Sequence, residues 1–370
     1  MFHTMLTPSR LITGAGSLNA LGDAAAALGR RALVVTGRSA LRASGTTERI
    51  VATLDAAGIT TTLFEGVEPE PACRTVDRVR ACLRDGKCNV VIGVGGGSVM
   101  DAAKVTAGLA GEDAPTVAFW EGRKVARPGV PFIAVPTTSG TGAEATKNGV
   151  ISNPDVPAKK SIRDDAFLAK CVVLDPELTL PCPGDVTAAA GMDALVQAVE
   201  SFTSIHASPV TDAWSFAAAR LLKDSVVAAY RDGSDLAART DAAYGSLLAG
   251  LALANARLGM VHGLAHPLGA RYHIPHGLVC AVLMPPVMRF NREACPEKYA
   301  RLDHLMKGDC IAFVEGLLAR LDLPTDLKHF NVDPAAIPTL VAESLPSGSL
   351  KANPRDATPE ACAEVLRSIL

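Results

Sequence analysis

Short apolar runs alternate with longer stretches of helical periodicity through the first half of the chain. The apolar runs lie at residues 32–37, 60–66, 89–97, 131–138 and 171–176. Apolar positions at helical spacing predict helices over residues 46–57, 74–86 and 98–110. Alternation of this kind is typical of parallel strands joined by crossover helices, so it predicts an α/β region with a Rossmann-like parallel sheet.

The pattern changes after the Pro/Gly-containing segment at residues 176–184. Long Ala/Leu-rich stretches with helical spacing follow, without runs of β-branched residues, and they predict an all-α region. A chain of 370 residues also exceeds the usual limit for one hydrophobic core, about 250–300 residues. We therefore expect an α/β dinucleotide-binding domain over residues 1–180 and a helical metal and substrate domain over residues 181–370.

Composition excludes several classes of partner. The 36 Lys and Arg residues nearly balance 38 Asp and Glu residues, and no basic stripe is present, so nothing favours a nucleic acid or an anionic membrane. No apolar run approaches the roughly 20 residues of a membrane span, and the first residues lack the pattern of a secretory signal. The nine cysteines include no C-x-x-C pair and are expected to be buried thiols. These features predict a cytoplasmic protein.

A glycine-rich turn lies between a predicted strand and a predicted helix in "VVIGVGGGSVMDAAK", residues 90–104. Bare backbone N–H groups at the start of a helix form an anion site, so this turn can hold a pyrophosphate. It does not match the standard Rossmann fingerprint, because Ser98 replaces the third glycine and the turn follows the third strand. The alternative is a tight turn that serves geometry alone.

A second polar turn follows the next predicted strand in "VPTTSGTGAEAT", residues 135–146. Its hydroxyl and backbone N–H groups can bond phosphate, ribose or amide groups. Two such turns at the carboxyl ends of neighbouring parallel strands predict the crevice in which α/β sheets bind nucleotides.

Candidate metal ligands occur in two separate segments of the second half. Asp193 and Gln197 are four residues apart and share one helix face, as do His262 and His266, and His276 follows after a Gly/Pro-containing turn. A proline directly after His266 should kink or end that helix. One carboxylate with two or three imidazoles suits a divalent zinc or iron site with an open position. The alternative for each histidine is a buried, hydrogen-bonded core residue.

Four separated motifs now carry a family resemblance: "GVGGGSVMDAAK", "PTTSGTGAEAT", "GMDAL" with "AVES", and "HGLAHPLGA" with "IPHG". Their order and spacing resemble the iron-containing (group III) alcohol dehydrogenases, relatives of glycerol dehydrogenase and dehydroquinate synthase. The resemblance covers nearly the whole chain. It implies an N-terminal α/β nucleotide domain, a C-terminal helical domain, catalysis in the cleft between them, and a homo-oligomer, by resemblance a dimer.

The resemblance also implies the residues that contact the cofactor. The matching positions for the pyrophosphate are Gly95, Gly96, Gly97 and Ser98, with Asp101 in the same helix; those for the nicotinamide side are Thr137, Thr138 and Thr141; Lys160 and Leu178 match two further cofactor positions.

The family's metal ligands are an Asp, a His four residues later and two further His, and the matching residues here are Asp193, Gln197, His262 and His276. Gln197 departs from this pattern. An amide oxygen binds transition metals more weakly than imidazole does, so we expect Fe²⁺ first, with Mn²⁺ or hydrated Zn²⁺ as alternatives. Maleylacetate reductases, which belong among the relatives, act without a metal, so an empty site is the other alternative. His266 matches a position near the substrate and is expected to relay the proton.

Cofactor preference depends on the end of the first predicted strand. Many family members carry an Asp at the position of Gly37, where a carboxylate bonds the adenosine ribose and repels a 2′-phosphate. Gly37 removes that repulsion, and Arg38 and Ser39 can meet a phosphate. The chain is therefore expected to use NAD(P), with NADP(H) preferred; the alternative is a solvated Arg38 on a turn.

These expectations converge on a metal-dependent alcohol dehydrogenase or aldehyde reductase, with reversible hydride transfer between a small primary alcohol and the nicotinamide. Three alternatives stay open: a maleylacetate-reductase-like reductase of oxo-acids with little metal dependence, a dehydroquinate-synthase-like lyase without net NADH change, and a non-catalytic nucleotide-binding protein.

Overall fold

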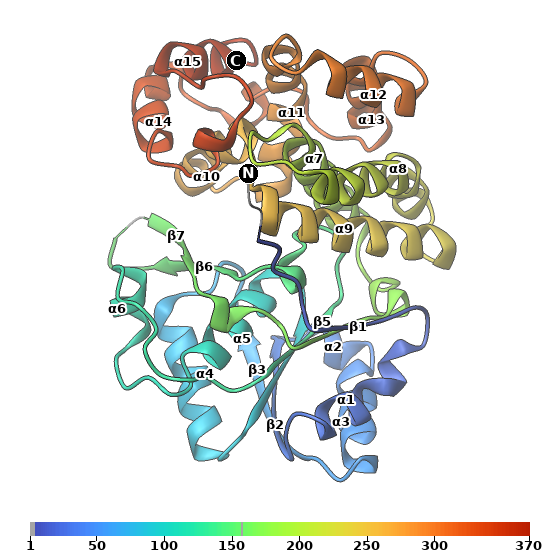
Figure 1. Ribbon diagram of the computed structural model, residues 1–370, viewed down its shortest axis with the longest axis vertical. Helices are drawn as coiled ribbons and strands as arrows, with labels where there is room; N and C mark the ends of the chain where they lie inside the picture. Colours follow the sequence, from blue (N-terminus) through green and yellow to red (C-terminus); the bar gives the residue numbers. More distant parts are fainter. Residues whose placement is uncertain (1–3, 157) are drawn as a thin grey trace. The chain divides into compact units, whose positions relative to one another are not determined.

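The computed structural model describes residues 4–156 and 158–370 (Figure 1). The chain forms two compact units. An α/β unit comprises Thr7–Thr138 and Gly142–Cys182, and a helical unit comprises Pro183–Leu370 with Ser139–Thr141 and the start of the chain up to Leu6. The short segment Ser139–Thr141 thus belongs by its contacts to the helical unit, although the sequence on both sides of it belongs to the α/β unit.

The α/β unit contains a six-stranded sheet in the order β1-β8-β5-β4-β2-β3, in which all pairs are parallel. The five predicted strands are confirmed as β2 (Arg31–Gly37), β3 (Thr60–Val67), β4 (Val90–Gly95), β5 (Phe132–Pro136) and β8 (Cys171–Leu174). The sequence pattern missed β1 (Arg10–Thr13), an edge strand whose four residues are mostly exposed. It also missed an antiparallel hairpin of β6 (Asn148–Asn153) and β7 (Ala158–Arg163).

Helices cover both faces of this sheet (Figure 1). Side chains of α1 (Leu21–Ala26) and α3 (Thr46–Ala56) share one buried cluster with alternate strand residues such as Val34 and Ile92. On the other face lie α4 (Cys73–Asp85) and α5 (Gly97–Gly108), where a Cβ on Gly93 would come within 2.7 Å of Ala103 in α5. The inner strands β2, β4, β5 and β8 are therefore buried on both sides, which explains their nearly continuous apolar sequence, whereas the edge strand β3 is only partly buried. Two short helices, α2 (Ala40–Ala43) and α6 (Thr116–Trp120), complete the unit.

The helical unit confirms the predicted all-α region, since its described residues contain no strand. Its helices are α7 (Gly184–Thr203), α8 (Pro209–Arg231), α9 (Leu236–Ala256), α10 (Met260–Tyr272), α11 (His276–Arg292), α12 (Pro296–Met306), α13 (Cys310–Arg320), α14 (Ile337–Ser344) and α15 (Pro359–Arg367). Buried side chains from α7, α8, α10, α11 and the C-terminal helices form one continuous apolar cluster. Among the described residues no single helix has the length and apolar composition needed to cross a membrane; α9 and α10 reach them only together, across a bend of 102°.

The sequence predicted that Pro267 would kink or end its helix. In the structure α10 does not end there. The helix continues to Tyr272 because its apolar face, including Leu264 and Leu268, is packed into the core of the unit. Its end is set instead by His273, which adopts a left-handed conformation with φ of 55°.

Candidate metal and nucleotide sites

The glycine turn after β4 has the backbone geometry of an anion site. Gly95 has φ of 155°, and a Cβ there would lie 2.7 Å from Val99, so the position requires glycine. Gly96 precedes the first turn of α5, and no side chain of the described part of the chain caps that helix end. Its first N–H groups are therefore available to an anion.

Strand register brings the three predicted cofactor segments to one edge of the sheet. Thr36 pairs with Val94, Gly95 pairs with Pro136, and the backbone N–H of Thr137 donates to the carbonyl of Gly95 at 3.0 Å. The chain runs outward from β2 to β3 and then returns past β2 to β4 and β5, so the direction of winding reverses between β2 and β4. Open α/β sheets bind ligands outside the carboxyl ends of the strands at such a switch point.

Two predicted cofactor residues in α5 have protein partners. The Ser98 hydroxyl accepts a hydrogen bond from the backbone N–H of Glu70 at 3.1 Å. The carboxylate of Asp101 accepts from the backbone N–H of Val150 at 3.0 Å and lies 3.7 Å from the ammonium of Lys104. Burial raises the pKa of Asp101 to about 6 despite these contacts. Asp101 therefore connects α5 to the β6–β7 hairpin.

The remaining predicted cofactor residues lie in different surroundings. Lys160 on β7 is exposed, and its ammonium lies 3.8 Å from the ring centre of Trp120. Leu178 is buried in the apolar cluster on the α1 and α3 face of the sheet. Thr137 and Thr138 belong to the α/β unit, whereas Thr141 belongs to the helical unit.

At the end of β2 the structure leaves room for a side chain on Gly37. A Cβ there would meet only Val67 and Val99, each at 3.9 Å. Arg42 nearby is paired with Glu65 and Glu48. Arg38 and Ser39 are exposed, and Arg38 has no ion-pair partner within the described residues.

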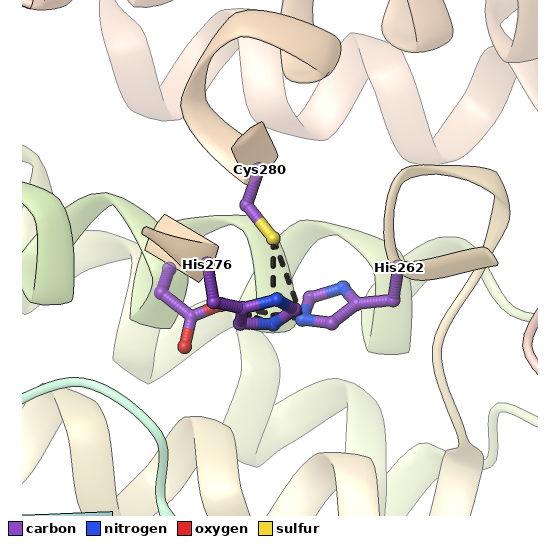
Figure 2. Close-up of side chains that lie close together, drawn as sticks. His262, His276 and Cys280 are labelled. Carbon is purple, nitrogen blue, oxygen red and sulfur yellow. Dashed lines mark hydrogen bonds and ion pairs between the residues drawn. The ribbon is translucent and has the colours of Figure 1, made fainter. Parts of the chain in front are cut away.

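Three helices bring the predicted metal ligands together in the helical unit (Figure 2). Asp193 comes from α7, His262 from α10 and His276 from the first turn of α11. Oδ1 of Asp193 lies 3.2 Å from Nε2 of His262 and 3.7 Å from Nε2 of His276. Sγ of Cys280, one turn after His276 on α11, lies 3.9 Å and 3.6 Å from the same two nitrogen atoms. One potential ligand atom from each of these four residues lies within 4.8 Å of all the others.

Electrostatics in this cluster favour a cation. Burial would raise the pKa of Asp193, but His276 and His262 outweigh it, so the pKa is lowered. Burial would lower the pKa of both histidines, but Cys280 and Asp193 raise it by more, and for His262 the pKa lies well above its usual value. The same surroundings that favour a proton on each imidazole favour a metal ion between them.

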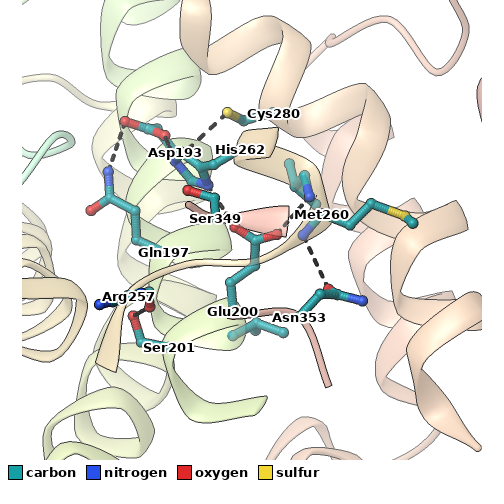
Figure 3. A network of polar contacts seen from close by, with 12 residues as sticks. Asp193, Gln197, Glu200, Ser201, Arg257, Met260, His262, Cys280, Ser349 and Asn353 are labelled. Carbon is teal, nitrogen blue, oxygen red and sulfur yellow. Dashed lines mark hydrogen bonds and ion pairs between the residues drawn. The ribbon is translucent and has the colours of Figure 1, made fainter. Parts of the chain in front are cut away.

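Glu200, which sequence reasoning missed, orients His262 (Figure 3). Its Oε2 lies 2.6 Å from Nδ1 of His262, and its Oε1 accepts from the backbone N–H of Val261 at 2.6 Å. With Nδ1 bonded to this carboxylate, Nε2 of His262 is the nitrogen that faces Asp193 and Cys280. Such a carboxylate–histidine pair fixes the tautomer of a metal-ligating imidazole. Glu200 lies seven residues after Asp193, on the same face of α7, and that spacing is the signal that could have identified it.

Gln197 contacts Asp193 through its amide nitrogen. Nε2 of Gln197 donates to Oδ2 of Asp193 at 2.9 Å, whereas Oε1, the only atom of this side chain that can bind a metal, has no hydrogen-bond partner among the described residues (Figure 3). In this conformation Gln197 holds the carboxylate rather than extending the ligand set.

His266 lies beside the cluster. Its ring stacks on that of His276 with centroids 5.4 Å apart and 20° between the planes, and its side chain is exposed. An exposed imidazole next to a predicted ligand histidine can exchange protons with solvent. His273 is the C-cap residue of α10, which gives this histidine a structural role.

The residues present fit a divalent metal ion. Asp193 is 3% exposed, and its Oδ1 accepts no hydrogen bond from any described residue even though two imidazole nitrogens lie nearby. Within the described chain, the ion-pair partners of Asp193 and Glu200 are histidines alone. A buried carboxylate without a lysine or arginine is costly unless a cation binds it.

Two family models together match nearly the whole chain. A model described as iron-containing alcohol dehydrogenase matches residues 8–176, and one described as Fe-containing alcohol dehydrogenase family, C-terminal, matches residues 187–370. Long-chain-alcohol dehydrogenase 1 of Geobacillus thermodenitrificans is 37% identical over 94% of this chain and 88% of its own length. A crystal structure of 1,3-propanediol oxidoreductase, 34% identical, superposes with a TM-score of 0.96 over the whole of both chains. Sulfoacetaldehyde reductase from Bifidobacterium kashiwanohense in complex with NAD⁺, 28% identical, gives a TM-score of 0.92 over 100% of this chain and 99% of that one.

Proposed function

Because the chain belongs to the iron-containing alcohol dehydrogenase family and is a metal-dependent, nicotinamide-linked oxidoreductase, we propose that it interconverts a small primary alcohol and its aldehyde with NADP(H). The observation that carries the proposal is the cluster of the buried Asp193 and His262 with the half-buried His276, in which a carboxylate oxygen lies beside two imidazole nitrogens without a hydrogen bond from any described residue.

Asp193, His262 and His276 would hold the divalent ion, which when bound supplies a positive charge that stabilises developing negative charge on the substrate oxygen. Glu200 keeps His262 in the tautomer whose Nε2 is free to bind. Gln197 fixes the other oxygen of Asp193, so that Oδ1 stays directed into the cluster. His266, stacked on His276 and exposed, is placed to carry the proton between the site and solvent.

We propose that the nicotinamide cofactor binds at the carboxyl ends of β2, β4 and β5, where the direction of winding of the sheet reverses. The glycine turn at Gly95–Gly97 and the start of α5 would bind the pyrophosphate, and Thr137 and Thr138 the nicotinamide side. NADP(H) is favoured over NAD(H) because Gly37 presents no carboxylate and Arg38 has no ion-pair partner among the described residues.

Lys160 and Thr141 complete the proposed set of cofactor-binding residues. Asp101 and Leu178 would act through the shape of the site, since Asp101 is hydrogen-bonded to Val150 and paired with Lys104, and Leu178 is buried in the apolar cluster. We assign the nucleotide to residues 1–180 and the metal and substrate to residues 181–370, in a homo-oligomer whose size light scattering would measure.

A substrate screen tests the reaction. Aldehydes of two to six carbons and the corresponding oxo-acids are offered with NADPH or NADH, each with and without added Fe²⁺. We expect aldehydes to be reduced, NADPH to give the larger kcat/KM, and chelation to remove activity. Activity on oxo-acids that survives chelation would indicate a reductase resembling maleylacetate reductase. Turnover without net change in NAD(P)H would indicate a lyase.

A further inference from the structure

Cys280 is a member of the ligand cluster that the family pattern does not supply. It is fully buried, lies on α11 one helical turn after His276, and directs Sγ toward the imidazole nitrogens of both predicted histidine ligands (Figure 2). None of the other eight cysteines forms a disulfide within the described chain, yet among them and Cys280 only Cys280 is part of a described group that could hold a metal.

The separations match those of a four-ligand site. Bonds of about 2.0–2.2 Å to nitrogen and oxygen and about 2.3 Å to sulfur place the ligand atoms of a tetrahedral ion about 3.3–3.8 Å apart. The measured distances are 3.2 Å and 3.7 Å from Asp193 to the two histidines, and 3.9 Å and 3.6 Å from Cys280 to them. Four of the six separations in the group therefore lie close to tetrahedral values, and all six are within 4.8 Å, so Sγ is placed to serve as a fourth ligand.

Gln197 occupies the position of the family's second ligand, a histidine, but it contacts Asp193 instead of facing the cluster with a ligand atom. Its amide nitrogen donates to Oδ2 of Asp193, and an amide nitrogen with two hydrogens cannot bind a metal. For Gln197 to become a ligand, its amide would have to reverse and give up this hydrogen bond.

We infer that Cys280 supplies the fourth metal ligand in this chain, in place of Gln197, and that its thiolate shifts the metal preference from Fe²⁺ toward Zn²⁺. This inference rests on the proposed function, because it presumes a metal at Asp193, His262 and His276. Thiolate is a soft ligand that suits zinc, whereas an amide oxygen suits harder ions. The preference is therefore opposite to the one expected from Gln197 alone.

The site still admits a substrate oxygen. The side chain of His276 is 38% exposed, whereas those of Asp193 and His262 are 4% exposed and Cys280 is fully buried. His276 is therefore the member of the cluster that solvent and substrate can reach. Catalytic zinc sites can take a fifth ligand as the reaction proceeds.

Cobalt provides a readout independent of activity. The metal-stripped enzyme is titrated with Co²⁺, and the near-ultraviolet absorption that arises from thiolate-to-cobalt charge transfer is recorded. We expect this band at one equivalent in the wild-type enzyme and its loss in Cys280→Ala. It should persist in Gln197→Leu, which removes the amide oxygen, and in Cys362→Ala, a matched loss of a buried thiol in α15 of the same unit.

Competition between Zn²⁺ and Fe²⁺ gives the second measurement. Cys280→Ala should lower the ratio of zinc to iron affinity by roughly tenfold or more, since even residues behind the ligands change affinity by about 10–100-fold. Stoichiometric Co²⁺ binding without the charge-transfer band in the wild type would overturn the assignment of Cys280 and leave the metal site intact. Absence of Co²⁺ binding altogether would overturn both proposals.

Discussion

The two units of this chain build their candidate sites from different chemical groups. The α/β unit presents backbone N–H groups at one turn, between β4 and α5, and its side chains there are small or absent. The helical unit presents side chains of Asp193, His262, His276 and Cys280, from the consecutive helices α10 and α11 and from α7, which lies far from them in the sequence. A spread, delocalised anion such as pyrophosphate is bound by several N–H groups, whereas a compact cation needs a few strong donor atoms.

This difference determines how each site can fail. A backbone site is lost when a side chain fills the space of the ligand, and a side-chain site is lost when one donor is removed. Substitutions in one unit should therefore affect one ligand and leave the other bound.

The largest effect is expected for His262→Ala. This change removes one of the proposed ligands and leaves Asp193 and Glu200 buried with fewer cationic partners. Bound metal should be lost, and kcat should fall by roughly 10³-fold or more, because ligand loss exceeds the 10–100-fold cost of outer residues. Elemental analysis and steady-state rates measure this, with NADPH titration as the internal control, since cofactor affinity should stay unchanged. Full metal content with full rate would refute the metal site.

His266→Ala should separate proton transfer from metal binding. The variant should keep its metal, since His266 is not a member of the ligand group, but lose roughly 10²–10⁴ in rate, the usual contribution of a positioned acid or base. His304→Ala, an exposed histidine on α12, serves as the control. If metal content falls together with the rate, His266 is a ligand and not a relay.

Gly96→Val tests the backbone site. A Cβ at Gly96 would already lie 3.3 Å from Oγ1 of Thr138, and a branched side chain would fill the turn where the pyrophosphate is proposed to lie. Because φ of −80° suits any residue, we expect the fold and the metal content to survive while cofactor affinity falls by more than about 100-fold, or about 2.7 kcal/mol. Circular dichroism and cofactor titration measure this, with Gly316→Val, at a position with open space, as the control. An unchanged dissociation constant would remove the turn from the cofactor site.

Glu200→Gln should weaken the metal site without removing a ligand. The substitution keeps the shape of the side chain but loses the charge that pairs with Nδ1 of His262. We expect metal affinity to fall by about 10–100-fold, as for other partners of ligating histidines. Metal-buffer titration measures the change, with the exposed Glu360→Gln as a control. Affinity equal to that of the control would show that Glu200 does not tune the site.

The smallest expected effect is that of Gly37→Asp. The neighbouring atoms leave space for the new side chain, and its carboxylate would face the adenosine ribose. The ratio of kcat/KM for NADPH to that for NADH should fall by about tenfold, about 1.4 kcal/mol. Gly37→Ala controls for bulk without charge. A ratio that follows the alanine variant would mean that the 2′-phosphate is recognised elsewhere.

The sequence by itself determined the architecture and the ligand types. Parallel strands buried on both faces must be apolar throughout, so β2, β4, β5 and β8 were visible as apolar runs; the partly buried edge strand β3 was also predicted, whereas the exposed edge strand β1 was not. The glycine turn was visible because all its groups lie in one short segment, and the spacing of Asp193, His262 and His276 indicated a metal.

Only the tertiary structure decided which side chains meet. Glu200 and Cys280 join the cluster because α7, α10 and α11 pack against one another, and the direction of the Gln197 amide depends on its neighbour Asp193. Packing also explains why α10 continues past Pro267 and why Leu178 is buried in the core of the α/β unit. Periodicity predicts which face of a helix a residue occupies, but the partner on that face is set by contacts between segments far apart in the chain, and no local pattern encodes them.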